Sequence, residues 1–304
     1  MPKFVLLWTD AVMWAMAAAL VAYVLYVWRS PARSANWRKV FRDPAALASS
    51  LVLLLCLAVT MVDSVHYRPL LPPAPGVRDA APAYDVRTRS LLDRLLQRLV
   101  SWRVGVRWYL VAVLLLPLGQ ILVTAAVVSP DALRALTPSA LAAYPGAYAA
   151  HFFFGPLFEE SGWRGFALPR MQRRFGPMRA TVLLGLLWSG WHFFLYAPAW
   201  FAGGGANGVL GLGLFVVFTT GLTVVFTWLS NNTGASLLLV ILLHGSVDGT
   251  ATYLQVLADR GVIPADAAAF SVEFGVLIVA VLTALALIAL TRGRLGYGRM
   301  PLCE

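Results

Sequence analysis

The chain has 304 residues, of which 60% are hydrophobic and only 12% are charged, and its mean hydropathy is +0.74. A soluble domain carries about a quarter charged residues, so the composition excludes an ordinary soluble globular protein. The formal net charge is +10, and the basic residues cluster between apolar runs, as in proteins that contact anionic lipid headgroups. No basic segment alternates with exposed aromatic residues as in nucleic-acid-binding modules. We therefore expect membrane lipids, and not nucleic acid, as partners.

Apolar runs of about 20 residues recur along the chain, the length at which a helix crosses the hydrocarbon core of a bilayer. We therefore predict an all-α, multi-pass transmembrane helical bundle with about eight membrane spans. The first run is too long for the core of a signal peptide, so we expect a retained helix. The predicted spans are residues 4–28, 45–65, 107–128, 144–168, 179–198, 208–229, 235–257 and 272–292.

A polar stretch separates the second predicted span from the third. Residues 67–83 are rich in proline and are expected to form an irregular linker. Residues 85–102 show a helical period that brings Leu92, Leu96 and Val100 onto one apolar stripe. This pattern predicts an interfacial amphipathic helix that lies in the headgroup plane. A helix packed on the protein's own surface would show the same pattern.

Basic loops set the expected orientation of the spans. From the third span onward, arginine-rich segments alternate with loops poor in basic residues, so spans three to eight are predicted to begin and end in the cytoplasm. The loop between the first two spans is also basic and does not fit this alternation. We therefore expect two parts, an N-terminal two-helix membrane segment at residues 1–80 and a second domain at residues 81–304.

Ionisable residues lie inside the predicted spans, where a charged side chain costs a few kcal/mol or more. From the helical rise, Glu159 and His244 each lie ~14 Å from the cytoplasmic ends of their helices, and His192 and Asp248 lie ~20 Å from them. Four groups from three helices are therefore predicted to share a level near the middle of the bilayer. The whole set comprises Glu159, Glu160, Arg164, His192, His244 and Asp248.

Two pairs in this set have the i,i+4 spacing that brings side chains together on one face of a helix. Glu160 precedes Arg164 by four, and a buried arginine requires such an anionic partner. Glu159 points about 100° away from Glu160 around the helix axis and is therefore the freer carboxylate. His244 precedes Asp248 by four. Asp248 either accepts a hydrogen bond from the imidazole or acts beside it on a substrate.

Any one of these residues has a structural explanation, since an intramembrane histidine often bonds neighbouring helices, but the set as a whole suits hydrolysis. Glu159 with His192 has the chemistry to hold and deprotonate a water molecule. His244 with Asp248 would lie where charge develops on a scissile carbonyl oxygen, if Asp248 is protonated or serves His244. A metal site stays open as well, because Glu159, His192 and His244 match the ligand set of catalytic zinc.

At these residues the chain resembles the CPBP family of intramembrane proteases, the CAAX-protease and bacteriocin-processing group. The family carries Glu-Glu-x-x-x-Arg, then Phe-x-x-x-His, then His-x-x-x-Asn. Here the second motif has Trp188 in place of Phe, and the third has Asp248 in place of Asn. An ionised Asp would repel an oxyanion to which an Asn amide would donate. The matching segments are Glu159-Glu160-Ser161-Gly162-Trp163-Arg164, Trp188-Ser189-Gly190-Trp191-His192 and His244-Gly245-Ser246-Val247-Asp248.

The resemblance implies peptide-bond hydrolysis in a membrane-associated protein or peptide, with the first Glu and first His activating water and the third motif stabilising the oxyanion. It implies a glutamate-dependent or metallo-endopeptidase, with or without a divalent metal such as zinc. The expected substrate carries a lipid-modified C-terminus or is a small exported peptide, and the expected location is the cytoplasmic (inner) membrane of a bacterium. Residues 1–80 fall outside this resemblance and resemble the N-terminal segment of peptide ABC-transporter permeases.

Two other classes of function remain as alternatives. A membrane scaffold or bacteriocin-immunity-type protein would keep the site without turnover, and Asp248 in place of Asn is the feature that favours it. A proton-coupled transporter subunit would use intramembrane carboxylates and histidines as a relay. Such a subunit is expected to show two related halves, and the sequence shows no internal symmetry.

Overall fold

The computed structural model describes residues 3–40, 42, 54, 57–71, 83–85, 88–153 and 155–299. Contacts between residues divide the chain into two compact units, residues 1–97 and residues 98–303. This division concerns packing, and the functional boundary near residue 80 stays a prediction.

The first unit combines helices with a small antiparallel sheet of strand order β1-β2-β3. In this sheet Phe4 pairs with Tyr67, so the first helix begins at Trp8 and not at Phe4 as predicted. Asp10 accepts a hydrogen bond from the Leu7 backbone N–H at 2.9 Å and thereby supplies a partner for one free donor of the helix start. The elements are β1 (Lys3–Val5), α1 (Trp8–Trp28), α2 (Pro31–Val40), β2 (His66–Arg68), β3 (Arg89–Ser90) and α4 (Leu91–Leu99).

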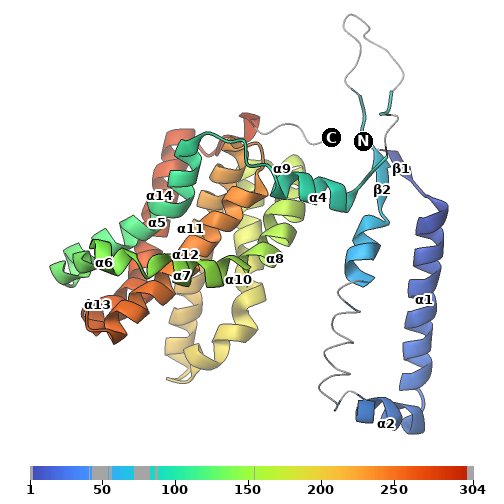
Figure 1. Cartoon of the computed structure of the whole chain (residues 1–304), viewed down its shortest axis with the longest axis horizontal. Coiled ribbons are helices and arrows are strands. Elements are labelled where there is room, and N and C mark those ends of the chain that lie inside the picture. Colours follow the sequence, from blue (N-terminus) through green and yellow to red (C-terminus); the bar gives the residue numbers. More distant parts are fainter. Residues whose placement is uncertain are drawn as a thin grey trace, which may run out of the picture. The chain divides into compact units, whose positions relative to one another are not determined.

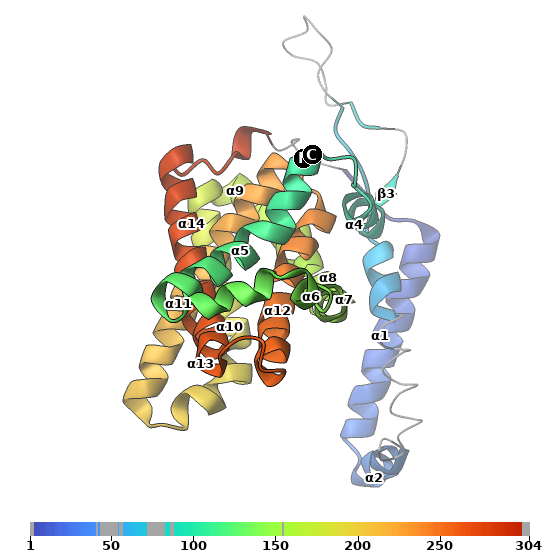
Figure 2. The same ribbon diagram turned by 60° about the vertical axis from the view of Figure 1, so that its left-hand side comes forward.

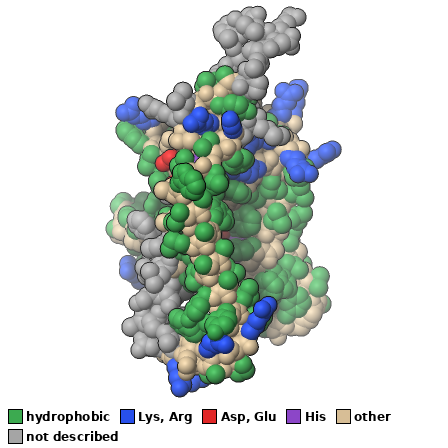
Figure 3. Space-filling view, turned by 90° about the vertical axis from the view of Figure 1, so that its right-hand side faces the viewer, with side chains coloured by type: hydrophobic (Ala, Val, Ile, Leu, Met, Phe, Trp, Pro, Cys, Tyr) green, Lys and Arg blue, Asp and Glu red, His purple; other side chains and the backbone are tan. Residues whose placement is uncertain are grey.

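The helix α1 has the composition of a membrane span, and none of its apolar window is buried inside the protein. Figure 3 shows hydrophobic side chains along this helix and Lys and Arg side chains gathered at the end where α2 lies. Arg33 of α2 stacks over the ring of Tyr26 at 3.7 Å from its centroid. An apolar rod that ends in a basic segment is typical of a helix anchored at the lipid headgroups.

The helix α4 is shorter than the predicted amphipathic helix, since it covers Leu91–Leu99 and not 85–102. Leu96 and Val100, two members of the predicted apolar stripe, are exposed. Whether this helix lies in the headgroup plane or packs on the protein's own surface stays a prediction.

The second unit is a bundle of helices, as Figure 1 shows. It begins with the long helix α5, and two short π-helical segments, η2 and η3, continue into the helices α9 and α14. The elements are α5 (Val106–Val127), η1 (Pro130–Leu136), α6 (Pro138–Leu141), α7 (Tyr144–Phe153), α8 (Pro156–Glu160), η2 (Ser161–Ala167), α9 (Leu168–Phe175), α10 (Pro177–Phe201), α11 (Gly205–Asn232), α12 (Leu237–Asp259), α13 (Ala265–Phe270), η3 (Ser271–Gly275), α14 (Val276–Thr291) and η4 (Tyr297–Arg299).

The predicted fold class is confirmed: the protein is an all-α, multi-pass membrane protein. Within the described ranges, six helices are long and apolar enough to cross a membrane, where the sequence predicted about eight. Most of the predicted span 45–65 lies outside the described residues. The six candidates are Trp8–Trp28, Val106–Val127, Pro177–Phe201, Gly205–Asn232, Leu237–Asp259 and Ala265–Thr291.

The predicted span 144–168 is not one continuous helix. The chain turns at Gly155, whose φ of +99° is accessible to glycine, and resumes at Pro156. A proline removes one helical N–H and disfavours the helical conformation of the residue before it. The short helix α8 and the π-helix η2 follow, and they carry the paired glutamates.

The helix α12 lies at the centre of the bundle. In α12, 72% of the apolar window is buried, against 39% or less in the other candidate spans. It packs against α5, α7, α8 and α11, and Figure 2 shows it beside α5 and α7. The surrounding core draws one or more side chains from each long helix of the bundle, among them Leu116, Trp188, Phe226, Leu243 and Val279.

Glycine permits a close approach between the backbones of α10 and α11. A methyl group at Gly185 would come within 2.8 Å of the Thr220 Cα atom. Backbone atoms cannot move away at low cost, so this contact requires glycine. The hydroxyl groups of Ser189 and Thr219 meet across the same two helices.

We expect Gly185→Ala to lower the free energy of unfolding by about 1–3 kcal/mol, because the added methyl group would force the two helices apart. Thermal unfolding of the purified protein in detergent measures this effect. Gly190→Ala is the matched control on the same helix, because a methyl group there meets no atom within 4 Å. Equal melting temperatures for the two variants would contradict the assignment of this contact.

Candidate active site

Three helical segments contribute the ionisable residues that the sequence singles out. The α8–η2 segment carries Glu159, Glu160 and Arg164, α10 carries His192, and α12 carries His244 and Asp248. The structure brings these side chains into two connected groups, a buried group around Glu160 and a partly exposed pair made by Glu159 and His192.

The buried group is centred on the carboxylate of Glu160. Arg164 Nη1 donates to Glu160 Oε1 at 2.8 Å, and both side chains are fully buried. His244 Nδ1 lies 2.8 Å from the same oxygen atom. Arg164 Nη2 also donates to Thr223 Oγ1 at 3.2 Å. The predicted i,i+4 ion pair is therefore present, and it extends to α11 and α12.

The Arg164 guanidinium also stacks on aromatic rings. Its Cζ atom lies 4.4 Å from the ring centroid of Trp188 and 4.5 Å from that of Phe226. A weakly hydrated, planar cation on aromatic faces is stabilised by the ring quadrupoles. The rings of Trp188 and Phe226 therefore stabilise the buried Arg164 cation.

The second group is the pair of Glu159 and His192. His192 Nε2 lies 4.0 Å from Glu159 Oε2, and both side chains are partly exposed. His192 Nδ1 lies 2.9 Å from the backbone carbonyl oxygen of Trp188. Because a carbonyl oxygen only accepts, Nδ1 carries the hydrogen, and in the neutral ring the lone pair of Nε2 is directed toward Glu159.

His244 lies between two carboxylates. Its Nδ1 atom donates to Glu160, and its Nε2 atom lies 3.5 Å from Asp248 Oδ2. Ionised carboxylates only accept hydrogen bonds, so this arrangement favours an imidazole ring with hydrogen atoms on both nitrogens. Asp248 itself is more than a third exposed.

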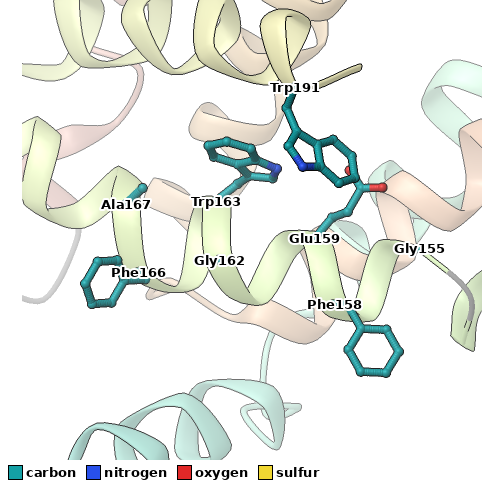
Figure 4. Close-up of a pocket in the computed structure, with 8 residues that line it drawn as sticks. All are labelled: Gly155, Phe158, Glu159, Gly162, Trp163, Phe166, Ala167 and Trp191. Carbon is teal, nitrogen blue, oxygen red and sulfur yellow. The ribbon is translucent and has the colours of Figure 1, made fainter. Parts of the chain in front are cut away.

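Glu159 borders an open pocket of about 540 Å³ whose other lining residues are apolar side chains and glycines. Figure 4 shows Glu159, Trp163 and Trp191 on one side of the α8–η2 segment, while Phe158 and Phe166 project from its other side. Trp163 and Trp191 meet edge to face at 6.5 Å between ring centroids. A carboxylate thus opens into a hollow with aromatic walls.

The suggested zinc ligands do not converge in this arrangement. His244 turns Nδ1 to Glu160 rather than to Glu159, while His192 stands beside Glu159. Within the part of the chain that the structure describes, no group of three or more His, Cys, Asp or Glu residues is placed to hold a metal ion. The zinc alternative therefore receives no support from the geometry of these residues.

Sequence reasoning missed the contribution of Arg98, which lies within the predicted amphipathic helix 85–102. Arg98 Nη2 donates to the Arg164 carbonyl oxygen at 3.0 Å, and Nη1 donates to that of Gly165 at 2.5 Å. Its Nε atom donates to the Ala235 carbonyl oxygen at 2.9 Å. One guanidinium thus ties the π-helix of the site to the start of α12, and no sequence pattern reveals backbone acceptors so far away along the chain.

Sequence reasoning noted Trp188 only as the residue that replaces phenylalanine in the second motif and assigned it no contact. Its indole Nε1 donates to Glu159 Oε2 at 2.9 Å. The signal was present in the sequence, because tryptophan stands where the resembled motif has phenylalanine and only tryptophan carries a donor.

The fold and the site define a multi-pass membrane protein with a polar cluster assembled inside its helical bundle. Residues 141–250 match the family model described as type II CAAX prenyl endopeptidase Rce1-like. The chain is also 29% identical over 108 residues to CAAX prenyl protease 2 of Methanococcus maripaludis, and the match covers 35% of this chain and 40% of that protein. These matches confirm the predicted resemblance to the CAAX protease family, and all six candidate residues lie within the family match.

We expect Glu160→Gln to destabilise the protein by about 3–5 kcal/mol, because it leaves the buried Arg164 cation without its anionic partner. The double variant Glu160→Gln/Arg164→Met should lose less stability than the sum of the two single variants. Thermal unfolding in detergent measures this double-mutant cycle.

The control for this cycle is Glu273→Gln, which removes an exposed carboxylate and should change stability by less than about 0.5 kcal/mol. Additive effects in the cycle would show that Glu160 and Arg164 do not depend on each other.

Proposed function

We propose that the chain is an intramembrane endopeptidase that hydrolyses a peptide bond in a membrane-associated protein or peptide. The observation that carries this proposal is the placement of Glu159 Oε2 beside His192 Nε2, at the edge of an open pocket. The resemblance to CAAX proteases supports the reaction class.

In the proposed reaction, Glu159 and His192 hold the attacking water. Both groups present acceptors on the same side, so a water molecule donates to each of them. Glu159 removes one proton as the water oxygen attacks the carbonyl carbon of the peptide bond. The C–N bond then breaks, and the proton passes from Glu159 to the leaving amine. This sequence balances charge and atoms with the chain's own groups.

His244 is the proposed electrophile for the tetrahedral intermediate. An imidazolium ring held between two carboxylates places positive charge inside the bundle, close to where an oxyanion develops. The 3.5 Å separation from Asp248 is longer than a strong charge-assisted hydrogen bond of ~2.8 Å. The Nε2–H group is therefore held loosely enough to turn toward the substrate oxygen.

Asp248 then acts as the counter-ion of His244 and not as an oxyanion donor. This role removes the conflict that an Asp raises at a position where the resembled motif has Asn. Glu160 and Arg164 support the site, since their ion pair joins the short helix α8, which carries Glu159, to the π-helix η2, and Glu160 also binds His244 Nδ1.

The proposed substrate is a protein or peptide segment with a large apolar group near the scissile bond. The pocket beside Glu159 is lined by Trp163, Trp191 and other apolar groups, which suits an apolar side chain or a lipid. The relative in Methanococcus maripaludis is named a prenyl protease, and a lipid-modified C-terminus is accordingly part of this proposal. We also propose that residues 81–304 form the protease domain. The proposed location is the bacterial inner membrane, although the relative is archaeal.

We expect Glu159→Gln to lower cleavage of a fluorogenic peptide by at least about 100-fold, because it removes the base while keeping the shape of the side chain. The assay uses the purified full chain in lipid vesicles, with matched peptides that do or do not carry a prenyl group. Glu273→Gln is the carboxylate control and should retain full activity.

The same assay separates the competing functions. Cleavage by the wild-type chain that survives a chelator favours water activated by Glu159 alone, whereas its loss favours a metallo-endopeptidase. No cleavage by any folded form would overturn the proposal in favour of a scaffold or a transporter subunit.

We expect Asp248→Asn to retain activity within about tenfold, because the amide oxygen still accepts from His244 and its N–H group can donate to an oxyanion. Asp248→Leu should lose most activity, because leucine offers neither charge nor hydrogen bond. Steady-state kinetics compares the two variants. An inactive Asp248→Asn variant with wild-type thermal stability would show that the carboxylate takes part in the chemistry more directly than proposed.

A further inference from the structure

Trp188 lies at the point where the two polar groups of the site meet. It is 2% exposed, and its indole Nε1 donates to Glu159 Oε2 at 2.9 Å. Its ring contacts both imidazoles edge to face, at 5.5 Å from His192 and 5.4 Å from His244 between centroids. The Arg164 guanidinium lies over the same ring. Trp188 therefore contacts a carboxylate, two imidazoles and a guanidinium of the site.

The side chain and the backbone of Trp188 have separate effects. The indole N–H group acts on Glu159, while the backbone carbonyl oxygen accepts from His192 Nδ1 at 2.9 Å. One residue therefore orients both members of the proposed water-holding pair. Any residue at this position supplies the carbonyl group, but only a side chain with a donor in that place supplies the first contact.

A buried donor fixes the rotation of the carboxylate that it contacts, because the donor occupies one lone pair of Oε2 and leaves the remaining acceptor positions for other partners. The indole cannot swing away, since Trp188 packs against Phe226 at 5.8 Å between centroids and carries the Arg164 cation on its face. The hydrogen bond is thus made by a rigid donor.

We propose that Trp188 is a positioning residue that holds the Glu159 carboxylate turned toward the water-binding side shared with His192. The inference rests on the proposed peptidase function and assigns a role to a residue that the resembled motif replaces with phenylalanine. A phenyl ring would fill the same space and leave Glu159 without this donor.

The test uses Trp188→Phe, which keeps the ring and the backbone carbonyl and removes only the N–H group and part of the indole. The purified full chain is assayed in lipid vesicles. We expect kcat to fall by about tenfold, because the carboxylate loses the hydrogen bond that holds it in its reactive rotation. KM should change less than kcat.

The control is Trp228→Phe, a core tryptophan on α11 that packs against Trp108 away from the polar cluster. It should leave kcat unchanged, and melting temperatures of both variants report any loss of folding. A merely structural Trp188 would lower stability without a separate fall in kcat, and an unchanged kcat in a folded Trp188→Phe variant overturns the inference.

A second measurement does not depend on catalysis. In protein labelled with ¹⁵N-tryptophan, the indole resonance that disappears in Trp188→Phe should shift in Glu159→Gln, because the acceptor changes from a carboxylate to an amide. An unshifted resonance would overturn the hydrogen bond itself. If the resonance shifts but the chain cleaves no peptide, the contact between Trp188 and Glu159 is confirmed and the proposed peptidase function is contradicted.

Discussion

The arrangement of the site depends on the fully buried carboxylate of Glu160. It accepts from Arg164 within its own segment and from His244 across the bundle, so a single anion links the π-helix to the central helix α12. Removing Glu160 would leave the buried Arg164 cation without its anionic partner, which costs several kcal/mol. This cost favours the one packing of η2 against α12 in which Arg164 and His244 both reach Glu160.

Two adjacent glutamates have different environments because consecutive residues of a helix point in different directions. Glu160 is turned into the bundle and is paired there, whereas Glu159 opens toward the pocket. The π-helix that follows them has wider turns than an α-helix, and such segments often occur at functional sites. Arg98 holds the carbonyl groups of this segment from outside, so its irregular geometry is supported on both sides.

Two positions differ from the resembled motifs, Trp188 and Asp248. Both change the hydrogen bonds or the charges around the residues of the proposed reaction. Tryptophan adds a donor to the free carboxylate, and aspartate adds a second anion beside His244. Both changes lie within hydrogen-bonding or ion-pair distance of the residues in the proposed reaction. The site therefore differs from the family pattern in its hydrogen-bonding and charge, while the order of its motifs along the chain is kept.

Composition and local spacing were enough to predict a helical membrane protein, the Glu160–Arg164 pair and the closeness of His244 to Asp248. These features depend on contacts within one helix, which a period of 3.6 residues fixes. The tertiary structure decided the rest: the interruption at Gly155, the turn of His244 Nδ1 toward Glu160, the indole contact of Trp188 and the three carbonyl partners of Arg98. Such contacts depend on how helices cross and rotate against one another, and side-chain packing across the whole bundle sets those angles.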